Sequence, residues 1–202
     1  MEIIRPSSEV EMIAEFLAAE FDSVRFSDEL RLTMSELGVD EKIITSPDIT
    51  SEHENMLRYR VLSEFRGYGA DSELFERFPD VDEWSLCRFG TEDLPRIRYI
   101  NYSYWDEISD GTHSPIGAAP VIRSGRKIFG QSTDGFIAAA AYIRGGGTFP
   151  KMFLLTADYG EFVIVEGHLR MTAYALAPEC FHDIECIVGK CESGALLHWL
   201  GE

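Results

Sequence analysis

The 202-residue sequence contains no apolar run long enough to cross a membrane, which takes about 18 or more consecutive apolar residues. Its first residues, MEIIRPSSE, have no basic stretch leading into an apolar one, so we expect no secretory signal. The four cysteines follow no regular spacing, which indicates free thiols in a reducing compartment. Together these absences predict a cytoplasmic protein that does not bind membranes.

Lysine is also scarce: the chain has 4 lysines beside 14 arginines and 35 acidic residues, and its net charge is −17. Residues 1–90 hold 21 acids and 9 bases, whereas residues 91–202 hold 14 acids and 9 bases. Proteins that wrap duplex DNA present a basic patch, because contacts with phosphates supply most of the affinity. We therefore expect no binding to duplex DNA. A small anionic ligand stays compatible with this charge, because local donors would hold it.

The first part of the chain has the patterns of a helical region. Ser8 and Glu11 form a capping-box pattern before an amphipathic run, and Gly38 and Gly67 stand where later runs stop. These patterns predict helices at residues 9–21, 27–37, 51–65 and 72–77. We expect an irregular stretch at residues 80–93, and we place the boundary of this acidic helical region at residue 90.

From Leu94 onward the sequence alternates between strand and helix patterns. An alternating aromatic run follows Leu94, and the residues around Ser124 and Gly125 resemble a hairpin. Further on, we predict a helix at residues 132–144 and strands at residues 150–156, 162–165 and 184–188. The expected fold class is α+β: a helical amino-terminal half (residues 1–90) packed on a mixed sheet with helices (residues 91–202).

Residues 162–176, FVIVEGHLRMTAYAL, carry the strongest chemical signal. Four apolar residues lead to Glu166 and Gly167, and an amphipathic run then begins with His168 and includes Arg170. This pattern predicts a buried strand that turns directly into a helix. A helix N-terminus has unpaired N–H groups and about half a positive charge, so it favours anions such as phosphate. Gly167 allows a sharp turn or a close approach of the backbone to a ligand.

The Gly-x-x-Arg spacing of Gly167 and Arg170, followed by Ala173, resembles the motif of the ParB/sulfiredoxin superfamily. The predicted order of elements around it is also similar to that of ParB amino-terminal domains. The resemblance implies that residues 91–202 form a ParB/sulfiredoxin-like domain, which binds a nucleotide or another phosphorylated ligand at the Glu166–Arg170 turn. If the protein is an enzyme, we expect Mg²⁺ and a nucleotide as its cofactors, because the Glu166 carboxylate at the end of the strand is a suitable ligand for Mg²⁺.

The chain departs from individual branches of this superfamily. Sulfiredoxins have a reactive cysteine directly after the glycine, where this chain has His168, so we expect no sulfiredoxin-like reductase. We also expect no helix-turn-helix segment of the kind that follows the domain in partition ParB proteins. Free-serine kinases have an acid-Gly-His arrangement similar to this one. Their catalytic carboxylate lies on an earlier strand, for which Asp106, Glu107 and Asp134 are the candidates here.

Each residue of the turn has two interpretations. Gly167 is either a phosphate contact or a plain strand-to-helix turn. Arg170 either grips a phosphate bidentately or forms an ion pair with Glu166 or Glu161. Glu166 either holds Mg²⁺ and accepts a proton as a catalytic group, or only orients Arg170. His168 either donates to the anion and transfers protons, as a second catalytic group, or faces solvent.

Two other groups of residues are candidate sites. The late cysteines and histidines lack the close spacings of structural zinc ligands, so we assign them no metal: Cys180, His182, Cys186, Cys191 and His198. An aromatic run could stack on a base, but we interpret it mainly as part of the hydrophobic core: Tyr99, Tyr102, Tyr104 and Trp105.

Two function classes follow. The first is a ParB-like protein that binds a phosphorylated ligand at the Glu166–Arg170 turn, and its enzymatic version is a Mg²⁺-dependent nucleotide hydrolase or phosphotransferase. The second is a non-catalytic regulatory protein whose acidic surface binds a protein partner.

Overall fold

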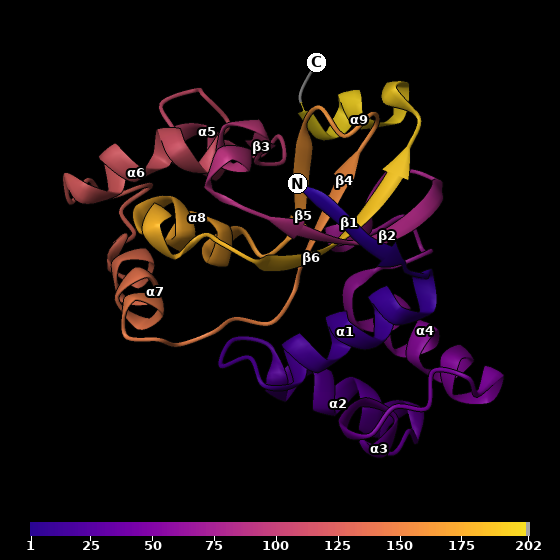
Figure 1. Ribbon diagram of the computed structural model, residues 1–202. Helices are drawn as coiled ribbons and strands as arrows, with labels where there is room; N and C mark the ends of the chain where they lie inside the picture. The colour runs from indigo at the N-terminus through magenta and orange to yellow at the C-terminus, as the bar shows by residue number, and fades with distance from the viewer. Residues whose placement is uncertain (201–202) are drawn as a thin grey trace. The chain divides into compact units, whose positions relative to one another are not determined.

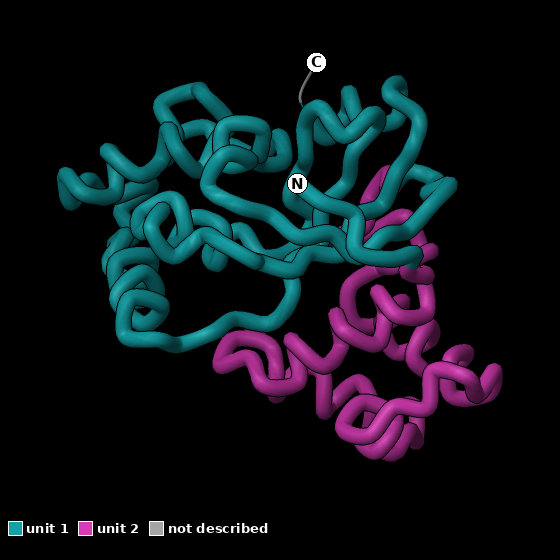
Figure 2. The backbone as a smooth tube through the Cα atoms, viewed as in Figure 1, with its two compact units in different colours: residues 1–6, 79–202 teal, residues 7–78 magenta. Residues whose placement is uncertain are grey.

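The computed structural model describes residues 1–200, which form two compact units (Figure 2). One unit consists of residues 7–78, and the other of residues 1–6 together with the described residues from 79 onward. The first six residues therefore belong with the second part of the chain. The predicted boundary between residues 90 and 91 lies inside the second unit.

The unit of residues 7–78 consists of helices. They are α1 (Glu9–Phe21), α2 (Ser27–Leu37), α3 (Lys42–Thr45), α4 (Glu52–Arg66) and the 3-10 turn η1 (Glu73–Phe75). The side chains of Ser8 and Ser51 accept hydrogen bonds from backbone N–H groups in the first turns of α1 and α4, which fixes where these helices begin. Gly38 and Gly67 end α2 and α4 in the left-handed conformation. The predictions for α1, α2 and α4 are confirmed to within one residue.

The core of this unit is mainly apolar, and the charged residues Glu20 and Arg58 are buried with it. Phe16, Leu17, Leu30 and Leu62 are completely buried. Arg58 on α4 is only 1% exposed, and hydrogen bonds to nearby carbonyl oxygens and to Glu54 compensate its burial.

The second unit contains a mixed six-stranded sheet within the described residues, with the order β1-β2-β6-β4-β5-β3. The strands are β1 (Glu2–Pro6), β2 (Val81–Phe89), β3 (Ile97–Arg98), β4 (Met152–Thr156), β5 (Phe162–Glu166) and β6 (Ile184–Cys191). β6 pairs antiparallel with β2 and parallel with β4, and β5 pairs antiparallel with β4 and parallel with β3. The predicted α+β class and the predicted strands corresponding to β4, β5 and β6 are confirmed.

Three local predictions are wrong. The stretch at residues 80–93 is not irregular, because it forms β2 and the first half of the following 3-10 helix η2 (Thr91–Arg96). The aromatic run after Leu94 forms only the two-residue strand β3 and then helix α5 (Ser103–Ile108). The expected hairpin at Ser124 is the end of helix α6 (Pro115–Arg123), which the side chain of Ser114 caps.

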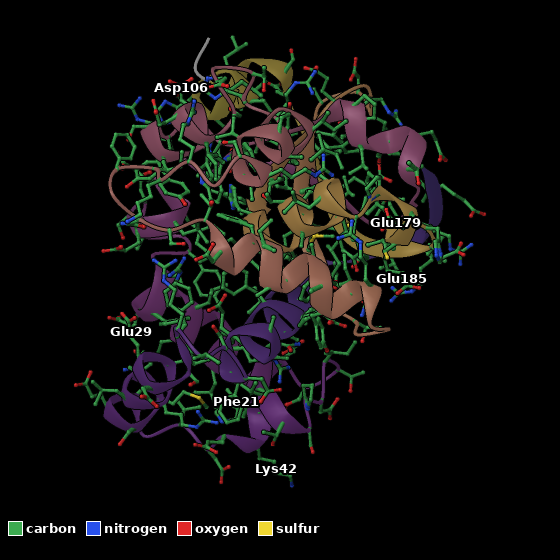
Figure 3. The ribbon with its side chains drawn as sticks, turned by 90° about the vertical axis from the view of Figure 1, so that its left-hand side faces the viewer. Phe21, Glu29, Lys42, Asp106, Glu179 and Glu185 are labelled. Atoms are coloured by element: carbon green, nitrogen blue, oxygen red, sulfur yellow. The ribbon has the colours of Figure 1, made fainter. Side chains whose placement is uncertain are left out.

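Helices cover one face of this sheet. α7 (Asp134–Arg144) and α6 both pack against α8 (His168–Leu176), and apolar residues of all three share one core with β2, β4, β5 and β6 (Figure 1). Arg144, at the carboxyl end of α7, donates to Glu179, which is labelled in Figure 3, and to the carbonyl oxygen of Leu176, both at 2.7 Å. These bonds tie α7 to the end of α8. The remaining elements are η3 (Pro178–Cys180) and α9 (Ser193–Leu200), and α9 contacts β4 and β5. No helix among residues 1–200 is both long enough and apolar enough to cross a membrane.

Candidate functional site

The turn between β5 and α8 has the predicted strand-to-helix form. Gly167 links the two elements with φ +108° and ψ 19°, and no side chain caps the helix. A Cβ at this position would lie 2.5 Å from Cγ of Met152 on β4, so the tight contact with β4 requires glycine. The first backbone bond of α8 runs from the N–H of Met171 to the carbonyl oxygen of Gly167, at 2.8 Å. The turn thus begins a helix without a capping side chain.

The N-terminus of α8 has free hydrogen-bonding capacity. Within residues 1–200, the backbone N–H groups of His168, Leu169 and Arg170 have no acceptor. The first turn also contains no acidic side chain that would neutralise the helix dipole. These groups are therefore available to an anion.

Arg170 forms an ion pair with Glu166. Its Nη2 bonds Oε1 of Glu166 at 3.0 Å, and its Nη1 bonds the carbonyl oxygens of Pro150 and Lys151 at 3.1 and 2.8 Å. The Arg170 side chain is only 11% exposed and that of Glu166 20%. Glu161, the other predicted partner, instead accepts from Arg98 at 2.6 Å. Arg170 therefore holds the chain before β4 against the turn, and two of its five N–H groups are left for a ligand.

His168 does not face solvent, so that interpretation of this residue is wrong. The residue is 8% exposed, and its ring stacks on Trp105 with a centroid distance of 4.7 Å and an interplanar angle of 15°. Tyr99 lies 4.7 Å from Trp105 and 6.0 Å from His168, also with nearly parallel rings. If Trp105 lay between the other two rings in a single stack, Tyr99 and His168 would be farther apart than 6.0 Å. Trp105 therefore stacks against both other rings and covers His168.

This environment keeps His168 neutral. The pKa of its imidazole is lowered to about 4, mainly by burial; the nearby Glu166 acts to raise this pKa and Arg170 to lower it. Nε2 is buried and has no hydrogen-bond partner among the described residues. A buried polar atom without a partner costs about 1–3 kcal/mol, so it marks a place where a ligand or a water would be stabilised.

Two consecutive hydrogen bonds link the ring of Tyr99 through Thr172 to the backbone of His168. The hydroxyl of Thr172 donates to the carbonyl oxygen of His168 at 2.6 Å, so the hydroxyl of Tyr99 must be the donor in its 2.6 Å bond to Thr172. Tyr99 is completely buried, in agreement with its interpretation as a core residue, whereas Tyr102 is exposed. Thr172 could not be predicted from the sequence, because nothing in its spacing relates it to Tyr99.

The candidate carboxylates from earlier in the chain lie on α5 and α7. Asp106, labelled in Figure 3, contacts Nε2 of His113 at 3.2 Å. Glu107 lies 3.9 Å from Arg126, and Asp134 begins α7. None of the three bonds a residue of the β5–α8 turn. Asp106 follows Trp105 directly, so α5 carries both a candidate carboxylate and the ring that covers His168.

Residues suited to holding a metal are sparse around the turn. No group of three or more His, Cys, Asp or Glu side chains is placed to bind a metal among residues 1–200. Glu166 is the carboxylate of the turn itself. Mg²⁺ is commonly bound by one or two carboxylates together with substrate phosphates, and Glu166 fits that limited role.

Comparison of the chain with protein-family models, with curated proteins and with solved structures found no match.

Proposed function

We propose that the β5–α8 turn binds a small phosphorylated ligand, with a nucleotide as the first choice, as its resemblance to the ParB/sulfiredoxin motif implies. One observation carries the proposal. A helix that begins at a glycine, without a capping side chain, also has a buried histidine whose Nε2 has no partner. Uncapped helix ends and unpaired buried nitrogens are each unfavourable alone, and one anionic ligand would satisfy both.

Each residue of the turn has a defined part in this proposal. Gly167 lets phosphate oxygens approach the backbone, where the N–H groups of residues 168–170 are free. Arg170 contributes its two remaining N–H groups and positive charge. His168 is neutral and offers one N–H, which a ligand engages fully when Trp105 moves off the ring.

The enzymatic version of the proposal is a Mg²⁺-dependent nucleotide hydrolase or phosphotransferase. Mg²⁺ would neutralise phosphate charge, and Glu166 would be its protein ligand or would accept a proton. Because Oε1 of Glu166 already accepts a bond from Arg170, its other oxygen, Oε2, is the atom for either role. Asp106 on α5 is the candidate for a second carboxylate.

The experiment is isothermal titration of the full chain with a panel of nucleotides and with inorganic phosphate, with and without Mg²⁺. The proposal predicts saturable binding of at least one phosphorylated compound. If the wild-type protein binds none of them, the result contradicts the proposal. It would favour the alternative, a non-catalytic protein whose acidic surface binds a protein partner.

Arg170→Ala should weaken binding of the best nucleotide about ten- to a hundredfold, because each charge-assisted hydrogen bond contributes about 1.5–3 kcal/mol. Arg170→Lys should restore only part of the affinity, since a point charge replaces the planar guanidinium. Titrations on variants whose circular dichroism matches the wild type would measure this.

The matched control is Arg144→Ala. Arg144 also bonds a carboxylate and a backbone carbonyl, but at the other end of α8. Its loss should leave nucleotide affinity unchanged. Equal losses in the two variants would mean that Arg170 acts only through the stability of the fold.

A further inference from the structure

A shallow groove on the unit of residues 7–78 lies between α1 and α4, and its volume is about 280 Å³. It is independent of the β5–α8 turn, since all its lining residues belong to this helical unit. The groove combines apolar side chains with one acid, one amide, one tyrosine and one arginine. The lining residues are Glu9, Val10, Ile13, Asn55, Met56, Arg58 and Tyr59.

Tyr68 holds the acid and the tyrosine of the groove in place. Its hydroxyl donates to Oε1 of Glu9 at 2.7 Å, and its ring packs edge-on against Tyr59 with a centroid distance of 5.6 Å. Tyr59 also fits closely over Gly69, where a Cβ would lie 1.8 Å from the tyrosine hydroxyl oxygen. A carboxylate and an aromatic ring, both fixed before binding, are the two groups that recognise an organic cation.

The arginine of the groove does not oppose a cation. Arg58 pairs with Glu54 at 3.1 Å, and its other Nη hydrogens go to the carbonyl oxygens of Ile43 and Asp48 and to the side chain of Asn55. Glu54 thus neutralises the charge of Arg58 inside the unit, although the buried Nε of this arginine has no partner among the described residues. Residues 7–78 contain 17 acids and 7 bases, a net charge of −10, so the surrounding potential also attracts cations.

The apolar wall sets the shape of the ligand. Val10, Ile13 and Met56 line the groove, and Met56 is 65% exposed although it is a large apolar residue. Lysine and arginine side chains bury an aliphatic stem while their charged head stays polar, which matches an apolar wall that ends at a carboxylate. The acidic charge disfavours nucleic acid, and it also disfavours a second copy of this chain.

We propose that the α1–α4 groove binds a basic side chain from a basic segment of a partner protein. The aliphatic stem lies along Val10, Ile13 and Met56. The charged head meets the Glu9 carboxylate and the face of Tyr59. The small volume suits one such side chain, so neighbouring residues of the partner segment make the remaining contacts on the exposed surfaces of α1 and α4.

The test is titration of the full-length, isotope-labelled protein with the blocked peptide Ala-Leu-Lys-Leu-Ala, followed by NMR. The expected result is saturable shifts of the Met56 methyl and Tyr59 ring signals. Replacing the peptide's lysine with glutamine should weaken binding about three- to tenfold, as expected for one partly exposed ion pair with a cation–π contact.

Glu9→Gln should weaken binding of the lysine peptide by a similar factor, and it keeps an oxygen that accepts from Tyr68. The matched control is Glu64→Gln, an exposed acid on α4 outside the groove lining, which should leave the affinity unchanged. Equal binding of the lysine and glutamine peptides, equal losses in the two variants, or no shift at Met56 and Tyr59 would each overturn the proposal.

Discussion

Replacing Gly167 with alanine should lower the free energy of unfolding by about 3–5 kcal/mol. Two costs combine at this position. The backbone is held at φ +108°, which residues with a side chain rarely adopt, and the new methyl group would lie 2.5 Å from Cγ and 2.9 Å from Cβ of Met152. Since Met152 is buried on β4, it has little room to move. Urea denaturation of the two proteins would measure the difference.

Gly125→Ala is the matched control. Gly125 lies in the same unit at φ +73°, and a methyl group added there would have no atom within 4 Å. The substitution should cost only the backbone strain, about 1–2 kcal/mol. If Gly167→Ala costs no more than Gly125→Ala, the close approach of the turn to β4 does not constrain the fold. A larger cost would show that Gly167 is required for packing, whether or not a ligand binds there.

The amino-terminal helices could be predicted from local signals. Ser8 and Ser51 cap α1 and α4 with bonds between neighbouring residues, and Gly38 ends α2 through its own backbone conformation. Such signals lie within a few residues of the helix end that they determine, so the sequence contains them directly.

Parts of the sheet could not be predicted in this way. β2 forms because Cys87 and its neighbours pair with β6, about a hundred residues later in the chain. β1 joins the sheet through the same strand, with Ile3 opposite Cys87. Pairing over such separations leaves little local pattern. For this reason the boundary of the helical region was predicted after β2, although β2 belongs to the second unit.

In the candidate site, too, some features follow from adjacent residues and others depend on residues far away in the sequence. The strand, Gly167 and the start of α8 follow from residues that are adjacent in the sequence, and so does the Glu166–Arg170 ion pair across one helical turn. The burial of His168 depends on Trp105, which lies far away in the sequence on α5. The resemblance to the ParB/sulfiredoxin motif stays a prediction.

The protein should lose stability as the pH falls from about 6.5 to 4, in part because of His168. The ordinary pKa of the imidazole is 6.5, and burial lowers the folded-state pKa to about 4. Between these values the unfolded chain binds a proton that the folded protein excludes, so acid favours unfolding. A shift of this size corresponds to about 3 kcal/mol by pH 4 and almost nothing above pH 7.

The measurement is the free energy of unfolding of the wild type and of His168→Phe at several pH values between 4 and 7.5. Phenylalanine keeps a ring against Trp105 but cannot take up a proton, so the difference between the two proteins should grow by about 3 kcal/mol towards pH 4. His182→Gln, which changes an exposed histidine, should follow the wild type. Parallel curves for the wild type and His168→Phe would mean that the imidazole takes up its proton without unfolding. In that case Nε2 reaches water or a charged partner when Trp105 moves away.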